Sequence, residues 1–338
     1  MIKDALVKLA DRTDLSEKEA EEVMAEIMDG AATPAQIAAY LMGLRLKGET
    51  VDEIAGSARA MRARATKIRV GSPIVVDTCG TGGDGGHTFN ISTTAAFVVA
   101  GTGLTVAKHG NRSISSRSGS ADVLAALGVK IDLSPDRVAD CVNEVGIGFL
   151  FAPLFHGAMK HCAGPRQEMG IRTLLNVLGP LTNPAGATHQ VLGVYDIRLT
   201  EILAKVLLQL GSQHCFVIHG MDGLDELTLC ERTKVSEGKG GVISNYFVSP
   251  EEFDLPRVHR KEIAGGTPED NARITRDILQ GMKGTKRDIV CLNAAAAIVA
   301  GQKAKTLKEG FRLAQQALDS GAAADKLDRL IAYSKRAS

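Results

Sequence analysis

The sequence predicts an α/β fold in which a small N-terminal helical domain precedes a larger domain with a mainly parallel central sheet. Three observations lead to this prediction. Helix-capping motifs crowd the first 66 residues, short β-rich apolar runs alternate with amphipathic stretches from about residue 72, and a glycine-rich turn follows the first of these runs. We therefore expect one domain over residues 1–70 and a second over residues 71–338.

The N-terminal segment carries the signals that start and stop helices. Residues 16–19 and 50–53 have the spacing of a capping box, in which a hydroxyl and a carboxylate three residues apart satisfy backbone donors. Thr33 followed by Pro34 is typical of an N-cap and first helical position, and Gly48 is typical of a C-terminal stop. These signals predict a compact bundle of short helices.

The remainder of the chain alternates between predicted strands and helices. The apolar runs that predict strands are Ile74–Val76, Leu104–Ala107, Gly148–Phe151, Val191–Val194 and Cys215–Ile218. Alternation of this kind is typical of right-handed βαβ units, whose ligands gather at the carboxyl ends of the strands. We expect an exposed loop over Ser236–Gly241 and a return to helices from about Pro268, with small side chains packing closely at Asn293–Ile298.

A turn rich in glycine, Asp77–Asn90, lies between the first predicted strand and a helix-like run at Thr94–Ala100. Five glycines let backbone N–H groups converge on one point, and the helix that follows adds the positive end of its dipole. This arrangement predicts a phosphate-binding turn; the alternative is an ordinary flexible loop.

A second polar segment, Lys108–Ser120, follows the next predicted strand. It holds one lysine, two arginines, one histidine and several hydroxyls, which suit the oxygens of a diphosphate. The alternative is a solvated basic loop ahead of a helix cap at Ser120. The neighbouring glycine-rich turn favours the anion site.

Two further blocks carry charge at places suited to a ligand. Asp225 and Glu226 follow the strand at Cys215–Ile218, where adjacent carboxylates fit Mg²⁺ but are also common on surfaces. Arg166 is expected at the start of an apolar helix, where it can bind a carboxylate or simply face solvent.

Composition excludes several classes of protein. A formal net charge of +1 argues against nucleic acid as a partner, and six widely spaced cysteines without a C-x-x-C pair argue against a zinc site or a disulfide framework. The N-terminus lacks the pattern of a signal peptide, and no run approaches the roughly 18 apolar residues of a membrane helix. We expect a cytoplasmic protein with no membrane contact.

Taken in order, these blocks resemble the signatures of the anthranilate phosphoribosyltransferase family over residues 6–332. The matching blocks are Gly80–Asp84 with Thr88–Thr93, Lys108–Arg112, Gly119–Asp122, Arg166 through Leu178–Pro184, and Asp222–Glu226. The resemblance implies transfer of the 5-phosphoribosyl group from 5-phosphoribosyl 1-diphosphate (PRPP) to the amine of anthranilate, in tryptophan biosynthesis. It also implies two Mg²⁺ ions, a homodimer that forms through the helical domain, and helices near residues 165–185 that join that domain.

The resemblance further implies a role for each matching residue. Lys108 and His109 would be catalytic, Lys108 by stabilising the departing diphosphate, and Ser92, Asp225 and Glu226 would hold magnesium. Anthranilate would contact Gly80, Asn111, His156 and Arg166. The residues around PRPP would be Gly80, Gly83, Asp84, Thr88, Asn90, Ile91, Ser92, Thr93, Lys108, His109, Gly110, Asn111, Arg112, Ser113, Ile114, Ser115, Ser116 and Ser120.

Two other functions fit parts of the pattern. A pyrimidine nucleoside phosphorylase-like enzyme also has a glycine-rich phosphate loop, but it uses free phosphate and needs no paired acids for magnesium. A noncatalytic relative that binds nucleic acid would carry a marked positive surplus, whereas this chain is almost neutral. The acid pair and the Lys108–Asn111 block favour the transferase.

Overall fold

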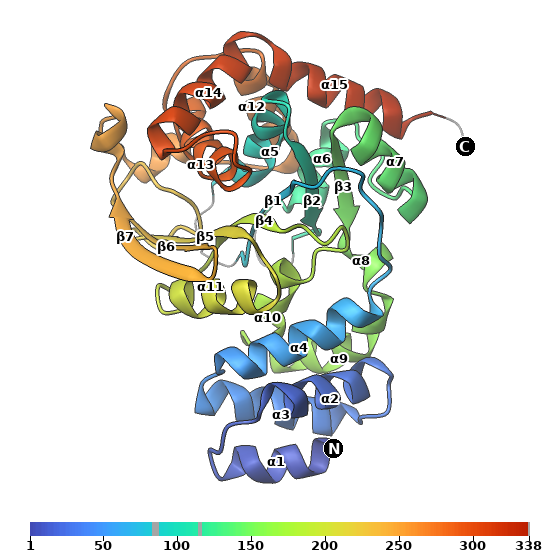
Figure 1. Cartoon of the computed structure of the whole chain (residues 1–338). Helices are drawn as coiled ribbons and strands as arrows, with labels where there is room; N and C mark the ends of the chain where they lie inside the picture. Colours follow the sequence, from blue (N-terminus) through green and yellow to red (C-terminus); the bar gives the residue numbers. More distant parts are fainter. Residues whose placement is uncertain (83–87, 114–116, 337–338) are drawn as a thin grey trace.

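The computed structural model describes residues 1–82, 88–113 and 117–336, and it contains a helical bundle beside an α/β domain (Figure 1). The bundle begins with four helices: α1 (Ile2–Ala10), α2 (Glu17–Met28), α3 (Pro34–Lys47) and α4 (Val51–Arg64). All three predicted N-terminal caps are present, since Ser16, Thr33 and Thr50 each accept a hydrogen bond from the backbone three residues on. Gly48 ends α3 with a φ of 92°, as predicted.

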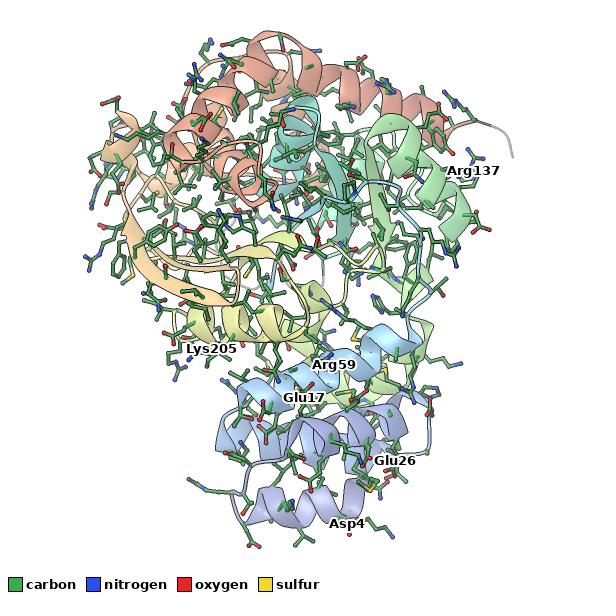
Figure 2. All side chains as sticks on the ribbon, in the orientation of Figure 1. Asp4, Glu17, Glu26, Arg59, Arg137 and Lys205 are labelled. Carbon is green, nitrogen blue, oxygen red and sulfur yellow. The ribbon has the colours of Figure 1, made fainter. Side chains whose placement is uncertain are left out.

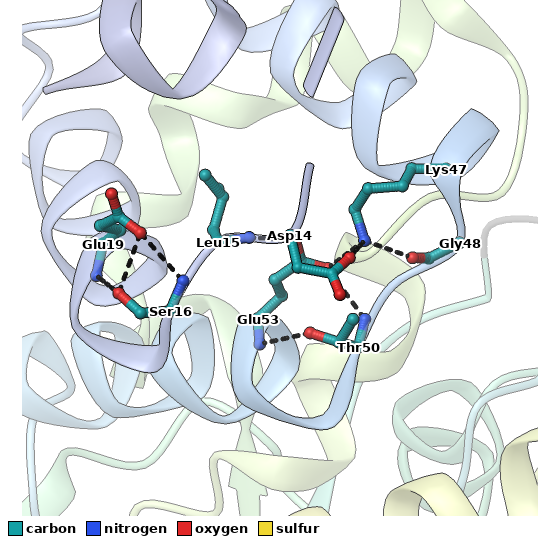
Figure 3. A network of polar contacts seen from close by, with 8 residues as sticks. All are labelled: Asp14, Leu15, Ser16, Glu19, Lys47, Gly48, Thr50 and Glu53. Carbon is teal, nitrogen blue, oxygen red and sulfur yellow. Dashed lines mark hydrogen bonds and ion pairs between the residues drawn. The ribbon is translucent and has the colours of Figure 1, made fainter. Parts of the chain in front are cut away.

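A buried carboxylate fixes the connections within this bundle (Figure 3). Glu53 is fully buried and accepts hydrogen bonds from the backbone N–H of Leu15 at 2.9 Å and of Thr50 at 2.8 Å. Lys47 lies 3.0 Å from the same carboxylate and 2.7 Å from Asp14. Because its charge is paired and its oxygens accept several bonds, Glu53 ties the end of α3 to the start of α2 at little electrostatic cost.

The α/β domain is built on one seven-stranded sheet with the order β3-β2-β1-β4-β5-β6-β7. Strands β1 to β5 run parallel, and β6 and β7 complete one side as an antiparallel hairpin. The strands are β1 (Val75–Gly80), β2 (Thr105–Gly110), β3 (Ile147–Phe151), β4 (His189–Gly193), β5 (His214–Gly220), β6 (Thr233–Lys239) and β7 (Val242–Val248). The mainly parallel sheet and all five predicted strands are thus confirmed.

The hairpin corrects one prediction. The segment Ser236–Gly241 is not an exposed loop: Ser236 is fully buried within β6, and only Gly240 and Gly241 form the turn. Their φ values of 56° and 82° are those of a two-residue hairpin turn, which glycine adopts without a steric penalty. Of the charged residues in this segment, Glu237 is half-buried and Lys239 is exposed, on a strand that is otherwise mostly buried.

Helices cover both faces of the sheet. The longer helices of the domain are α5 (Ile91–Gly101), α7 (Pro135–Val145), α11 (Leu199–Gln209), α12 (Pro268–Leu279), α13 (Thr285–Ala300), α14 (Leu307–Asp319) and α15 (Ala322–Ser334); the short ones are α6 (Ser120–Ala126) and α8 (Ala152–Phe155). On one face α5 and α13 pack on the central strands beneath α14 and α15, while α11 lies on the opposite face, towards the bundle (Figure 1). Among the described residues, no helix combines the length and apolar character needed to cross a bilayer.

The bundle shares its apolar core with the sheet. In β5, Phe216 and Ile218 pack into the core under α5 and α13, whereas Cys215 and Val217 face the other side and join the core of the bundle. Two further helices from later in the chain, α9 (Lys160–Met169) and α10 (Leu175–Leu178), complete that second core.

Arginines at the junction bind the C-terminal end of α11. Arg59 of α4 donates to the Gln209 carbonyl at 2.8 Å and pairs with Glu17 of α2, and the two side chains are labelled in Figure 2. Arg62 donates to the Leu210 carbonyl at 2.9 Å. Cations at this end of a helix satisfy free carbonyls and complement the helix dipole, so they hold bundle and sheet together.

Candidate active site

Four strands end in glycine at the same edge of the sheet. β1, β2, β4 and β5 finish at Gly80, Gly110, Gly193 and Gly220, and their parallel pairing brings these ends together. At Gly193 the loop after β5 passes so close that a Cβ would lie 1.6 Å from the Asp225 carbonyl oxygen. Side chains at the strand ends would push such loops away, so the glycines let them pack directly over the edge.

The acid pair, Asp225 and Glu226, contacts the glycine-rich turn and the start of the helix that follows it. The Asp225 carboxylate accepts from the Gly82 N–H at 3.0 Å, and the Glu226 carboxylate accepts from the Ser92 N–H at 3.0 Å. Ser92 belongs to the first turn of α5, where the helix dipole favours negative charge. Residues more than 130 positions apart in the chain therefore form one site, as the sequence predicted from strand ends.

The donor set suits a hard cation only in part. Two carboxylates and the Ser92 hydroxyl offer oxygen ligands, which Mg²⁺ prefers. Yet within the described residues no group of three or more His, Cys, Asp or Glu side chains could hold a metal. A magnesium ion at this edge therefore needs further oxygens from water or from a bound phosphate, as is usual for magnesium in phosphate-binding sites.

The second polar segment starts later than predicted, because β2 continues through Lys108 and His109 to Gly110. Lys108 is 3% exposed and donates to the Thr78 carbonyl of β1. Burial lowers the pKa of Lys108, while the nearby charges of Asp77 and Glu226 favour its protonated form. The Lys108 side chain is thus buried against β1 and is not part of a solvated basic loop.

Asp77 is a buried acid for which no role is predicted from the sequence. Its carboxylate accepts from the His109 N–H at 3.2 Å and from the Asn183 amide at 2.8 Å. Burial raises the pKa of Asp77, and Lys108 opposes this shift. Because Asn183 also donates to the Ala107 carbonyl at 2.8 Å, this cluster fastens the segment after α10 to the adjacent strands β1 and β2.

Asp122 fixes both ends of the loop that follows β2. Its carboxylate accepts from the N–H of Ser113 at 3.0 Å and of Gly119 at 2.9 Å, and it pairs with Arg112 at 2.9 Å. Ser120 starts α6 and donates to the Asn111 carbonyl at 3.3 Å. The two described ends of the loop are therefore held together by Asp122 and Ser120.

Asn90 links the two loops. Its amide donates to the Ser118 carbonyl at 3.1 Å, and its side-chain oxygen accepts from the Ser118 hydroxyl and from the Asn271 amide, both at 3.1 Å. Asn271 is a buried residue of α12 that the sequence did not single out. Its position after Gly266 gives no local sign of this role, since the contact joins residues 181 positions apart. Of the predicted site, Gly83, Asp84, Ile114, Ser115 and Ser116 lie outside the described residues.

Two of the four residues predicted to contact anthranilate, His156 and Arg166, come from the segment between β3 and β4 that joins the bundle, whereas Gly80 ends β1 and Asn111 follows β2. Arg166 lies in the last turn of α9, not at the start of an apolar helix, because Gly170 ends α9 with a φ of 61° and the helix accommodates Pro165 internally. Arg166 is half-buried, and burial lowers its pKa. It still carries its charge at neutral pH and can bind a carboxylate.

Two buried imidazoles lie side by side. The ring centroids of His109 and His156 are 5.1 Å apart. Burial lowers the pKa of His109 to about 3, with a further contribution from His156, and burial lowers the pKa of His156 to about 4. Both rings are therefore neutral at pH 7.

Comparisons with known proteins cover almost the whole chain. Residues 3–65 match the helical bundle domain of a glycosyl transferase family, and residues 72–324 match its a/b domain. An anthranilate phosphoribosyltransferase of Desulfosudis oleivorans is 56% identical over 99% of both chains. The crystal structure of anthranilate phosphoribosyltransferase from Thermus thermophilus is 46% identical, with a TM-score of 0.94 over 98% of this chain and 100% of the other.

Complexes of a more distant relative have also been solved. Anthranilate phosphoribosyltransferase from Saccharomyces cerevisiae, in complex with PRPP and Mg, is 29% identical with a TM-score of 0.89 over 98% of this chain and 97% of the other. A second structure of that protein holds 4-fluoroanthranilate.

Proposed function

This chain belongs to the anthranilate phosphoribosyltransferase family, and from this premise we propose which of its residues carry the reaction. The enzyme transfers the 5-phosphoribosyl group of PRPP to the amine of anthranilate and releases diphosphate, a step of tryptophan biosynthesis. The family assignment sets aside the phosphorylase and the nucleic-acid-binding alternatives. The observation that carries the proposal is the contact of Asp225 with the glycine-rich turn and of Glu226 with the first turn of α5.

PRPP binds across the two loops that Asn90 joins. Its anionic groups take the main-chain donors of the first turn and the N-terminal turn of α5, and they take hydroxyls and cationic side chains of the Asn111–Ser120 segment. In support of PRPP as the ligand, the yeast relative has been solved in complex with PRPP and Mg. The proposed ligands are those given from the sequence, with Gly80, Thr88, Asn90, Ile91, Thr93 and Gly110 among the described ones.

Two magnesium ions bind at the acid pair. Asp225, Glu226 and Ser92 supply protein oxygens, and the substrate's phosphates supply others, which fits the small number of acidic groups at this edge. The bound ions neutralise charge on the diphosphate as it leaves. Lys108 adds a fixed positive charge beneath the same edge, where burial makes it effective.

Anthranilate binds between the bundle and the sheet. Arg166 holds its carboxylate, Asn111 contacts its polar edge, and His109 and His156 line its approach with Gly80. Because the amine is neutral at pH 7, its attack on the sugar carbon needs positioning more than a strong base. The neutral imidazoles fit that requirement.

We further propose that two chains form a homodimer through the helical domain, in the cytoplasm. Val7 of α1 is 66% exposed and Leu46 of α3 is 70% exposed, on two helices that pack together at the far end of the bundle from the sheet (Figure 1). Exposed apolar side chains of this kind favour burial against a second copy. Light scattering after size-exclusion chromatography measures the assembly.

Domains of residues 1–70 and 71–338, with helices near 165–185 joining the first, complete the proposal.

The metal assignment is tested with the double variant Asp225→Asn, Glu226→Gln. The amides keep an oxygen that can accept from Gly82 and Ser92, so the fold should be retained while the two negative charges are lost. We expect turnover at limiting Mg²⁺ to fall by about tenfold or more, measured by the fluorescence of anthranilate as it is consumed. A Mg²⁺ activation curve that matches the parent enzyme would rule out the assignment.

A further inference from the structure

The acidic loop, residues 221–232 between β5 and β6, is held from inside the domain by one amide side chain. Asn293 is 3% exposed and lies in the middle of α13, the helix that packs on the central strands. The Leu227 N–H donates to its side-chain oxygen at 2.8 Å, and its amide donates to the Leu227 carbonyl at 2.9 Å. A third bond runs from the amide to the Ile289 carbonyl at 2.9 Å.

Leu227 directly follows the acid pair, so these bonds fix the backbone at the end of that pair. The other end is fixed by the turn itself, in which the Gly220 N–H donates to the Leu224 carbonyl at 2.8 Å. Between the two anchors, the Asp225 carbonyl presses on Gly193 of β4. Asp225 and Glu226 therefore have little freedom along the main chain.

This rigidity matters because two adjacent carboxylates repel one another. Without a fixed backbone, the loop would move the acids apart and towards water. The free energy needed to bring the two carboxylates together again would then weaken the binding of a cation. The apparent dissociation constant for the ion equals the intrinsic constant divided by the fraction of molecules whose two acids are already in the binding arrangement. A side chain that holds the arrangement thus strengthens cation binding without touching the cation.

We propose that Asn293 is a positioning residue for the magnesium site, acting through the Leu227 peptide groups on Asp225 and Glu226. This rests on the proposed function, in which those acids bind the ion. The four alanines that follow Asn293 in the helix, Ala294 to Ala297, are fully buried and have no polar side-chain atom, so the two bonds to Leu227 depend on the amide at this position.

The test measures ion binding without turnover. Mn²⁺ serves as a paramagnetic substitute, and free Mn²⁺ is followed by electron paramagnetic resonance in the presence of saturating PRPP and no anthranilate. The variants are Asn293→Ala, which removes both bonds to Leu227, and Asn293→Ser, whose hydroxyl can still bond the Ile289 carbonyl if the alanine variant does not fold. The double variant Asp225→Asn, Glu226→Gln is titrated beside them.

The matched control is Ser334→Ala. Ser334 of α15 is 1% exposed and accepts from the Lys130 N–H at 3.0 Å, so it too is a buried side chain bonded to a distant peptide group, but away from the acidic loop. A loss of general stability should therefore affect the control and the Asn293 variants alike.

We expect the Mn²⁺ dissociation constant to rise about tenfold in the Asn293 variants and to stay unchanged in Ser334→Ala, since outer residues of metal sites commonly contribute 10- to 100-fold. The KM for PRPP should rise while that for anthranilate stays constant. A Mn²⁺ dissociation constant within about twofold of the parent in both Asn293 variants would overturn the proposal. If the acid double variant binds Mn²⁺ like the parent, the metal site itself is misplaced; if it alone loses binding, only the role of Asn293 fails.

Discussion

His109 and His156 illustrate how burial sets the chemistry of single residues in this site. Their rings are neutral in the folded protein because burial depresses both pKa values, to about 3 and about 4. An imidazole in the unfolded chain keeps a pKa near 6.5. The unfolded state therefore takes up protons first as the pH falls.

The sign of the resulting pH dependence follows from this difference. Stability from the neutral imidazoles is fully present above about pH 6.5 and is lost as the pH falls towards 4, with each histidine contributing a slope of at most about 1.4 kcal/mol per pH unit. We predict that His156→Gln, whose amide does not titrate, flattens the slope of unfolding free energy between pH 6.5 and 4.5. Urea unfolding across that range measures the slope, and an unaltered slope would show that His156 is not neutral in the folded enzyme.

Arg166 carries the proposed contact with the anthranilate carboxylate. Loss of a hydrogen-bonded charge costs about 1.5–3 kcal/mol, so Arg166→Ala should raise the KM for anthranilate by roughly ten- to a hundredfold. The KM for PRPP should change little, as Arg166 belongs to the joining segment. Steady-state kinetics with each substrate varied in turn measures both. Arg137→Ala is the control, because Arg137 of α7 (labelled in Figure 2) donates to the Tyr333 carbonyl of α15 and contacts none of the described residues of the proposed site; an equal rise in both KM values would count against the assignment.

Among the elements, strand β4 shows how a residue without a side chain shapes the site. A Cβ on Gly193 would lie 1.6 Å from the Asp225 carbonyl oxygen, against backbone that cannot rotate away. We predict that Gly193→Ala displaces the acidic loop, costs about 1–3 kcal/mol of stability and abolishes most Mg²⁺-dependent turnover.

Gly164→Ala provides the comparison. Gly164 lies within α9, and a Cβ there would have no atom within 4 Å, so alanine should stabilise the helix by up to about 1 kcal/mol. Thermal unfolding of both variants checks the pair. Equal melting temperatures would show that β4 does not press on the loop.

The elements also show which features can be predicted from sequence. Caps at Ser16, Thr33 and Thr50 act over three residues, and apolar runs have the length of the strands they form, so both were predicted correctly. The ends of the strands were predicted less accurately. Strand β2 continues through Lys108 and His109, because pairing with β3 buries two polar residues of a kind that is typical of loops. The hairpin at Gly240 and Gly241 was missed because charge along β6 obscured a two-glycine turn.

The contacts by which buried amides anchor the loops from distant helices could not be predicted. Asn271 and Asn293 bond to groups 181 and 66 positions away, and neither stands in a pattern that names its partner. The family resemblance pointed to the loops that meet at the strand ends, because the matching motifs lie in those loops. It did not identify the buried amides that hold those loops in place.

In the whole molecule, the bundle and the sheet meet over a shared apolar core, and the proposed anthranilate site lies at that junction, beside the strand ends that we propose bind PRPP. PRPP is proposed to contact the strand ends, whereas Arg166 and His156 come from the segment that joins the bundle. A small hinge movement of the bundle would bring amine and sugar together and exclude water, which competes for the activated sugar.

The central claim is that the two loops and the acid pair bind the diphosphate and its metal as one unit. The most direct measurement is a crystal structure of the enzyme with PRPP and Mg²⁺. We predict electron density for the diphosphate between the first turn and the Asn111–Ser120 segment, with magnesium beside Asp225 and Glu226. Density for PRPP away from both loops, or metal bound without either carboxylate, would contradict the claim.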